Sequence, residues 1–148
     1  MLPSGSDRHD HSDHGDHGPV ELVRSARLAA VPYAYAATPA RGGRYLFTAG
    51  ACPLGLDGRV VAPGDLVAQT EQVVANLRTA LEEAGAGLDC VVKTTVYVAS
   101  EHRDDLHTAW RVVAGAFAEH DAPSTLLGVT VLGHPDQLVE LDAVAVLP

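Results

Sequence analysis

The sequence predicts an α+β protein with the element order β-β-α-β-α-β-β, in which both helices cover one face of a single mixed sheet. Two segments, residues 65–84 and 103–120, carry apolar residues at helical spacing. A β-branched run, residues 90–99, lies between them, and two strand-like runs, residues 124–132 and 138–147, close the chain. The other face of such a sheet needs a cover, so we expect an oligomer.

The first two strands are predicted before the first helix. Residues 20–30 (VELVRSARLAA) show rough alternation of polar and apolar side chains, and Pro32 interrupts the pattern. Residues 45–49 (YLFTA) suit a second strand. The sequence Leu-Asp-Gly-Arg at residues 56–59 is typical of a tight hairpin turn.

The helices are predicted from their caps and apolar stripes. Asp65 suits the N-cap of the first helix, and Gly85 suits its end. The first stripe contains Leu66, Thr70, Val73, Val74, Leu77, Ala80, Leu81 and Ala84. The second stripe contains Leu106, Trp110, Val113, Ala114 and Phe117. Both stripes therefore predict buried helix faces.

Residues 1–19 differ in composition from the rest, with four His and four Asp but few large apolar residues. Such a segment buries too little surface to offset its ordering entropy, so we predict a flexible tail followed by one domain, residues 20–148. The spacing of the histidines would suit a flexible metal chelate, but we predict no preformed metal site. These histidines are His9, His11, His14 and His17.

Composition argues against several classes of partner. The formal net charge of −9 repels phosphate backbones, so nucleic acid is not expected. No apolar run approaches the roughly 18 residues that span a bilayer, and the first residues lack the pattern of a secretory signal. We therefore expect a cytoplasmic protein without a membrane segment. Its two cysteines, Cys52 and Cys90, are expected to be reduced.

Six local motifs occur in a fixed order along residues 20–148. The strand-like VVKTTVYV and LVELDA segments are the most specific of them. The motifs are Pro32-Tyr33, Phe47–Gly50 with Pro53, Gln69–Gly85, Val91–Val98, Glu119-His120 and Leu138–Ala143. In this order they resemble the Rid family of imine/enamine deaminases, also called the YjgF/YER057c/UK114 family.

The resemblance implies a chorismate-mutase-like fold and a homotrimer with small-molecule clefts between subunits. It implies no metal and no organic cofactor. In the deaminase branch a glutamate on the last strand positions water, a tyrosine lines the cleft, and an arginine on the penultimate strand pairs with the carboxylate of a 2-imino or 2-enamino acid. Tyr33, Gly50 and Glu140 match the family's tyrosine, glycine and glutamate.

The arginine has no counterpart, because Pro123 or Ser124 falls at its position and Arg111 is the last basic residue of the chain. An arginine fork gives two charge-assisted hydrogen bonds to a carboxylate, and an unpaired buried carboxylate is costly. We therefore expect 2-imino acids to be used inefficiently and a neutral or bulkier ligand to be preferred, oriented by Ser124 and Thr125. Arg44 and Arg111 remain candidates to replace the missing cation.

Each candidate side chain also has a purely structural interpretation. Glu140 suits a pocket carboxylate or a solvated strand face, and Tyr33 suits the cleft or the core, with Tyr35 as a competitor. Cys52 suits a small buried structural thiol first and a residue beside the ligand second. Trp110 suits the core first and a ligand-facing role second, and His134 precedes Glu140 in a loop.

Two hypotheses about function follow. The first is a hydrolase acting on an imine, an enamine or a related carbonyl compound, with Glu140 and Tyr33 as catalytic residues and Gly50, Cys52, Trp110, Ser124 and Thr125 around the ligand. The second is a non-catalytic ligand-binding or regulatory trimer of the same fold. The ribonuclease activity sometimes attached to the family conflicts with the acidic composition.

Overall fold

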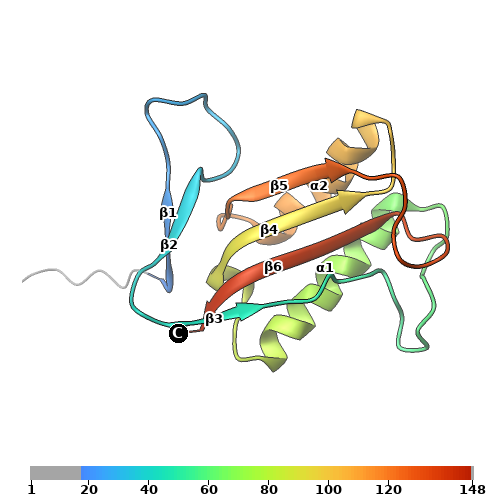
Figure 1. Cartoon of the computed structure of the whole chain (residues 1–148), viewed down its shortest axis with the longest axis horizontal. Coiled ribbons are helices and arrows are strands. Elements are labelled where there is room, and N and C mark those ends of the chain that lie inside the picture. Colours follow the sequence, from blue (N-terminus) through green and yellow to red (C-terminus); the bar gives the residue numbers. More distant parts are fainter. Residues whose placement is uncertain (1–17, 148) are drawn as a thin grey trace, which may run out of the picture.

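The computed structural model describes residues 18–147, which form a four-stranded mixed sheet with two helices on one face and a separate two-stranded sheet (Figure 1). The main sheet has the order β3-β6-β4-β5, in which β4 and β5 are parallel and the other pairs antiparallel. The elements are β1 (Val20–Val23), β2 (Ala36–Pro39), β3 (Arg44–Phe47), α1 (Leu66–Glu83), β4 (Val91–Val98), α2 (Arg103–Phe117), β5 (Ser124–Gly128) and β6 (Val139–Leu147).

Both helices form where the sequence predicts them. The Asp65 carboxylate accepts a hydrogen bond from the Ala68 N–H (3.0 Å) at the start of α1, and Gly85 follows its end with a φ of 86°. Asp104 and Asp105 lie in the first turn of α2, where the positive end of the helix dipole favours acids. The turn at residues 56–59 also forms, since the Gly55 N–H donates to the Arg59 carbonyl (2.9 Å).

The N-terminal strands differ from the prediction. The expected strand at residues 20–30 ends at Val23, and its partner is β2, a strand that the sequence analysis did not predict. The backbone leaves the strand at Ser25, whose hydroxyl accepts from the Arg27 N–H (3.1 Å) in a local turn, and Pro32 lacks an N–H to continue a ladder. Figure 1 shows this pair beside one end of the main sheet.

The predicted strand at residues 45–49 is β3, Arg44–Phe47, and the strand predicted at residues 124–132 stops at Gly128. Of the flexible tail predicted at residues 1–19, residues 1–17 with all four histidines lie outside the described residues. Neither helix within residues 18–147 has the length and apolar character needed to cross a membrane.

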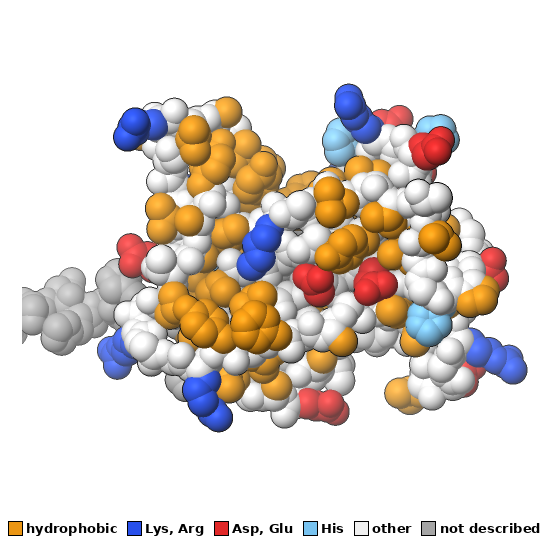
Figure 2. All heavy atoms as spheres, viewed as in Figure 1, with side chains coloured by type: hydrophobic (Ala, Val, Ile, Leu, Met, Phe, Trp, Pro, Cys, Tyr) orange, Lys and Arg blue, Asp and Glu red, His pale blue; other side chains and the backbone are white. Residues whose placement is uncertain are grey.

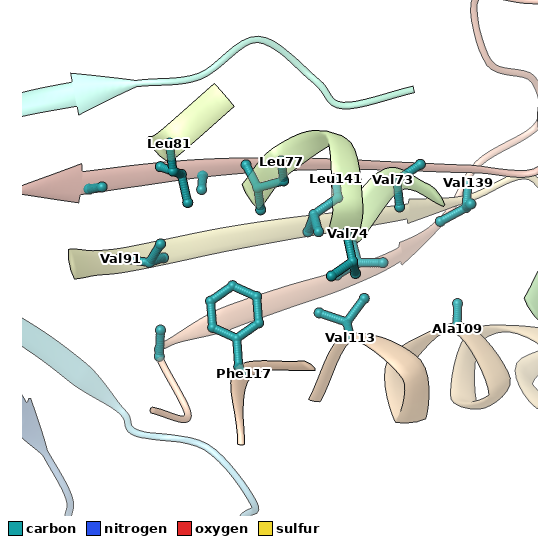
Figure 3. Packing of buried hydrophobic residues seen from close by; sticks show 14 of the residues in the cluster. Val73, Val74, Leu77, Leu81, Val91, Ala109, Val113, Phe117, Val139 and Leu141 are labelled. Atoms are coloured by element: carbon teal, nitrogen blue, oxygen red, sulfur yellow. The ribbon is translucent and has the colours of Figure 1, made fainter. Parts of the chain in front are cut away.

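The core lies between the helices and the inner face of the sheet (Figure 3). Leu77 and Leu81 of α1 are fully buried there, as are Val96 of β4 and Leu141 of β6. Full burial of one such side chain contributes roughly 1.5–3 kcal/mol. Every second residue of β6 points into this core, so its intervening residues, Glu140 and Asp142 among them, point to the opposite face.

Among residues 18–147, no helix lies over this opposite face, which is called the outer face below (Figure 1). Tyr45 and Phe47 of β3 are 56% and 75% exposed on it, and Leu127 of β5 is also exposed. Figure 2 looks onto the outer face and shows acidic and basic side chains near its middle, bordered by hydrophobic ones. The arrangement agrees with the predicted need for a covering partner.

Candidate functional site

Glu140 lies on β6 opposite Tyr97 of β4, and its carboxylate is held by neighbours from the same subunit. Gln137 Nε2 donates to Glu140 Oε2 (3.1 Å), and the thiol of Cys52 lies 3.7 Å from the same oxygen. Gln137 is itself 4% exposed, and its Oε1 accepts from the His134 N–H (3.0 Å). The carboxylate is therefore fixed through one oxygen, Oε2.

Gly50 makes room for the other oxygen. A Cβ atom at position 50 would lie 1.8 Å from Glu140 Oε1, closer than any side chain allows. The adjacent backbone is held against β6, since the Ala51 N–H donates to the Leu141 carbonyl (2.7 Å) and the Leu141 N–H donates to the Ala51 carbonyl (3.2 Å). Only glycine at position 50 leaves Glu140 Oε1 in its observed place.

Cys52 follows in the same loop. Asn76 of α1 anchors this loop by donating to the carbonyls of Cys52 (2.9 Å) and Leu54 (3.0 Å). Burial, followed by the Glu140 charge, raises the pKa of the Cys52 thiol above its usual range. At neutral pH Cys52 is therefore a protonated donor to Glu140 and a weak nucleophile.

An open cavity of about 410 Å³ borders Gly50 and Cys52, between the β3 end and α1. Its wall is largely apolar and includes Leu46, Leu77 and Ala80. Glu140 itself does not line this cavity, which meets the Glu140 group at Gly50 and Cys52.

Tyr33 and Trp110 form a second group of predicted residues. Their rings meet edge to face at 6.1 Å between centroids, and Tyr35 packs against Tyr33 at 6.4 Å. The Tyr35 hydroxyl donates to the Ala29 carbonyl (2.7 Å), so it is used within its own loop. Trp110 and Ser124 line a small cavity of about 80 Å³ together with Pro32.

Asp121 ties the N-terminal segment to this second group. The Arg24 guanidinium donates to both Asp121 oxygens (2.5 and 2.6 Å), and the Ala34 N–H donates to the Asp121 carbonyl (2.9 Å). This pairing with Arg24 lowers the pKa of Asp121. None of these contacts involves Glu140, so the predicted site residues lie in two separate groups within one subunit.

Ser124 and Thr125 point to opposite faces of β5. The Ser124 hydroxyl lies 2.5 Å from that of Thr94 and donates to the Ala122 carbonyl (3.0 Å), so it is satisfied inside the subunit. Thr125 pairs in register with Thr95 and points to the outer face. There its hydroxyl accepts a hydrogen bond from Lys93 Nζ (2.5 Å). The two hydroxyls do not face one ligand within a subunit.

Sequence reasoning missed two groups, Gln137 and Lys93. Gln137 lies two residues before β6 and is buried, whereas the sequence shows only a polar residue in a loop there. Lys93 was found only as part of a motif, because its nearness to Thr125 depends on the parallel pairing of β4 and β5. The candidates Arg44 and Arg111 have other positions: Arg44 begins β3 opposite Leu147, and Arg111 donates to Thr108 within α2 (3.1 Å).

The sequence as a whole matches one known family. The profile of the family described as Endoribonuclease L-PSP fits residues 24–147. The chain belongs to the YjgF/YER057c/UK114 family, also called the Rid family. It is 33% identical over 132 residues to a RutC family protein of Synechocystis, covering 87% of this chain and 98% of that protein. A RutC family protein of Pyrococcus abyssi is 34% identical over 103 residues, covering 70% and 79%.

Solved Rid family structures have the same fold. The Rid family protein YyfB of Yersinia pestis superposes with a TM-score of 0.81 at 30% identity, covering 87% of this chain and 99% of that one. A YjgF/YER057c/UK114 family member of Mycobacterium tuberculosis superposes with a TM-score of 0.60 at 31% identity, covering 86% and 99%. The predicted family and the predicted α+β, chorismate-mutase-like fold are thus confirmed.

Among residues 18–147, no three side chains of His, Cys, Asp or Glu gather as metal ligands. The Glu140 group offers a carboxylate with one oxygen held by Gln137 and one oxygen that lies against the backbone of Gly50. Such a carboxylate suits proton transfer or the positioning of water.

Proposed function

We propose that this Rid family chain hydrolyses an imine, an enamine or a related carbonyl compound, as a cytoplasmic homotrimer whose clefts lie between subunits. The observation that carries the proposal is the geometry at Glu140, where Gln137 holds Oε2 and the missing side chain of Gly50 gives Oε1 its place. Family membership supports a small-molecule role of this type. No cofactor is required for the chemistry.

The hydrolysis balances with water alone. Glu140 takes a proton from a water molecule as its oxygen attacks the imine carbon, and the imine nitrogen gains a proton. The resulting carbinolamine breaks its C–N bond, the nitrogen leaves as ammonia or an amine, and the hydroxyl becomes the carbonyl. Gln137 and Cys52 act by keeping the carboxylate aimed at the water.

The trimer is part of the proposal because one subunit separates the predicted residues. Tyr33 and Trp110 pack together at a distance from the partners of Glu140, and the exposed Phe47 and Tyr45 leave the outer face for another copy to cover. A neighbouring subunit would supply the aromatic group and the small-molecule cleft would close between the two. In the proposed trimer, residues 20–148 of each subunit form one domain.

The lack of an arginine on β5 supports the further expectation that 2-imino acids are used inefficiently. The hydroxyl of Thr125 and a lysine cannot reproduce a bidentate fork, so a carboxylate would be held loosely. Loose orientation costs rate even where binding persists. We expect neutral imines to be turned over at least as well as 2-iminopropanoate.

Ammonia release from 2-iminopropanoate and from a neutral imine tests the proposal. In Glu140→Gln we expect turnover to fall by about 10²–10⁴-fold, the usual contribution of a general base. Glu71→Gln, which removes an exposed carboxylate from α1, is the matched control and should behave like the wild type. Equal turnover in the wild type and Glu140→Gln would refute the role of Glu140.

The alternative is a non-catalytic ligand-binding trimer of the same fold. The observation that favours it is the incomplete set of groups for a 2-imino acid, since β5 carries no basic residue. In that case neither imine is hydrolysed above the rate in buffer, in any variant, while small carbonyl compounds still bind.

A further inference from the structure

Lys93 is the single lysine of the chain and has an unusual environment on the outer face. It is half-buried, and its ammonium has one hydrogen-bond partner in its surroundings, the Thr125 hydroxyl at 2.5 Å. Within residues 18–147, no carboxylate lies within 4 Å of it. A lysine ammonium has three N–H donors, so two of them remain available.

A β-bulge aims Lys93 at this face. In the pairing of β4 with β6, Val91 lies opposite Ala145 and Lys93 lies opposite Val144, so Val92 is an extra residue. Val91 points into the core, and strict alternation would turn Lys93 inward as well. The bulge reverses this, and bulges that re-aim a side chain are frequent beside functional sites.

The nearest acidic influence on Lys93 is Asp142, which does not pair with it. Asp142 faces Thr95, the next outer-face residue of β4, and its Oδ2 accepts from the Tyr97 hydroxyl (3.2 Å). Its charge raises the pKa of Lys93 less than burial lowers that pKa. Partly buried charges in proteins are normally paired, so a counter-ion is expected at Lys93.

We propose that Lys93, with Thr125 beside it, binds the carboxylate of the small ligand on the outer face. A carbonyl compound or imine that carries a carboxylate would therefore bind at one point, through the Lys93 ammonium, while neutral ligands would bind without this contact. Such a contact binds the group without fixing its rotation, which agrees with inefficient use of 2-imino acids.

The inference rests on the proposed function and on its trimer. Lys93 lies four residues before Tyr97, the partner of Glu140, so about 13 Å of strand separates the two groups within a subunit. The proposal therefore takes the Glu140 of a neighbouring subunit as the carboxylate beside a ligand held by Lys93. The site is thus complete only when a second copy covers the outer face.

Binding of 2-oxobutanoate to the full-length protein tests the proposal, with 2-oxobutanamide as its uncharged analogue. We expect Lys93→Met to weaken 2-oxobutanoate binding by roughly tenfold or more, the scale of a hydrogen bond to a charged group. Lys93→Arg should retain most of the affinity, and added salt should weaken binding in the wild type. Binding of the amide should be the same in all three proteins.

Arg111→Met, which removes a cation from the exposed side of α2, is the control and should bind 2-oxobutanoate normally. Glu140→Gln should lose imine turnover and keep 2-oxobutanoate binding, whereas Lys93→Met should weaken that binding, which is measured without any turnover. The two proposals can therefore fail separately.

Three results would overturn the role of Lys93. One is a wild type that does not bind 2-oxobutanoate, and another is unchanged affinity in Lys93→Met. The third is loss of the oligomer in Lys93→Met with retention in Lys93→Arg, measured by light scattering. That result would mean that a carboxylate of a neighbouring subunit is the counter-ion.

Discussion

Three charged side chains, Lys93, Asp142 and Glu140, lie on the outer face. The two outermost, Lys93 and Glu140, differ in how many of their hydrogen-bonding atoms have partners. At Glu140 the carboxylate has a buried amide donor, a thiol at its side and a glycine that leaves room for it, all from one subunit. At Lys93 the ammonium has one hydroxyl partner. A satisfied group is already oriented for chemistry, whereas a partly satisfied charge requires a partner from outside. The acid end therefore suits catalysis and the cationic end suits binding.

The largest expected effect comes from disturbing the satisfied end at Gly50. In Gly50→Ala the new methyl group would collide with Glu140 Oε1 and force the carboxylate to move. A displacement of about 1 Å can cost roughly 100-fold in rate, and we expect a loss of that size in imine turnover. Overpacking should also lower the free energy of unfolding by about 1–3 kcal/mol, measured with urea.

Gly42→Ala is the control, because a methyl group there would meet nothing within 4 Å. Its turnover and stability should equal those of the wild type. Turnover of Gly50→Ala within twofold of the wild type would show that the observed position of Glu140 does not matter for catalysis.

A smaller effect is expected from Gln137, the amide that holds Glu140. Gln137→Leu removes the donor to Glu140 Oε2 and leaves the Val139 carbonyl and the His134 N–H without their side-chain partner. We expect about a tenfold fall in turnover and a stability loss of about 1–3 kcal/mol. The rate is measured at a temperature where the variant is folded.

Cys52→Ala separates the contributions of the two donors. The thiol is a weak donor at 3.7 Å, so its loss should change turnover by no more than about threefold. If Cys52→Ala were as damaging as Gln137→Leu, the thiol would have a role in the reaction that its raised pKa does not predict.

Local patterns were enough to predict most of the fold. The stripes of both helices and the alternation of Val139, Glu140 and Leu141 depend on residues close in sequence. They were confirmed except at Ala80 and Ala84, which belong to the predicted first stripe but are exposed. The N-terminal strands were not predicted correctly, because β1 depends on pairing with β2 and on the contact between Arg24 and Asp121, 97 residues apart. Such long-range contacts override a weak local pattern.

The candidate site shows the same limit. Glu140 and Gly50 could be named from their motifs, and the structure places them together, although their roles stay predictions. No cation for a ligand carboxylate could be predicted from β5 and β6, because no Lys or Arg follows Arg111 in the sequence. The cation beside Thr125 comes from Lys93, 32 residues earlier, through parallel strand pairing and a bulge that periodicity alone could not reveal.

The mildest change is expected from Asp142, the acidic residue whose charge acts on Lys93. Its charge raises the pKa of Lys93 and also opposes a bound carboxylate. Asp142→Asn should therefore strengthen 2-oxobutanoate binding by about twofold to fivefold at neutral pH, as expected for a partly screened charge.

Because only the protonated ammonium binds the anion, affinity falls as pH rises through the pKa of Lys93, which burial places below that of an ordinary lysine. In Asp142→Asn that pKa falls further, so the loss of affinity should begin at lower pH. Dissociation constants between pH 6 and about 10 measure both effects, and Glu82→Gln, an exposed acid on α1, should change neither. Weaker binding in Asp142→Asn at neutral pH would mean that Asp142 orients Lys93 for the ligand and does not compete with it.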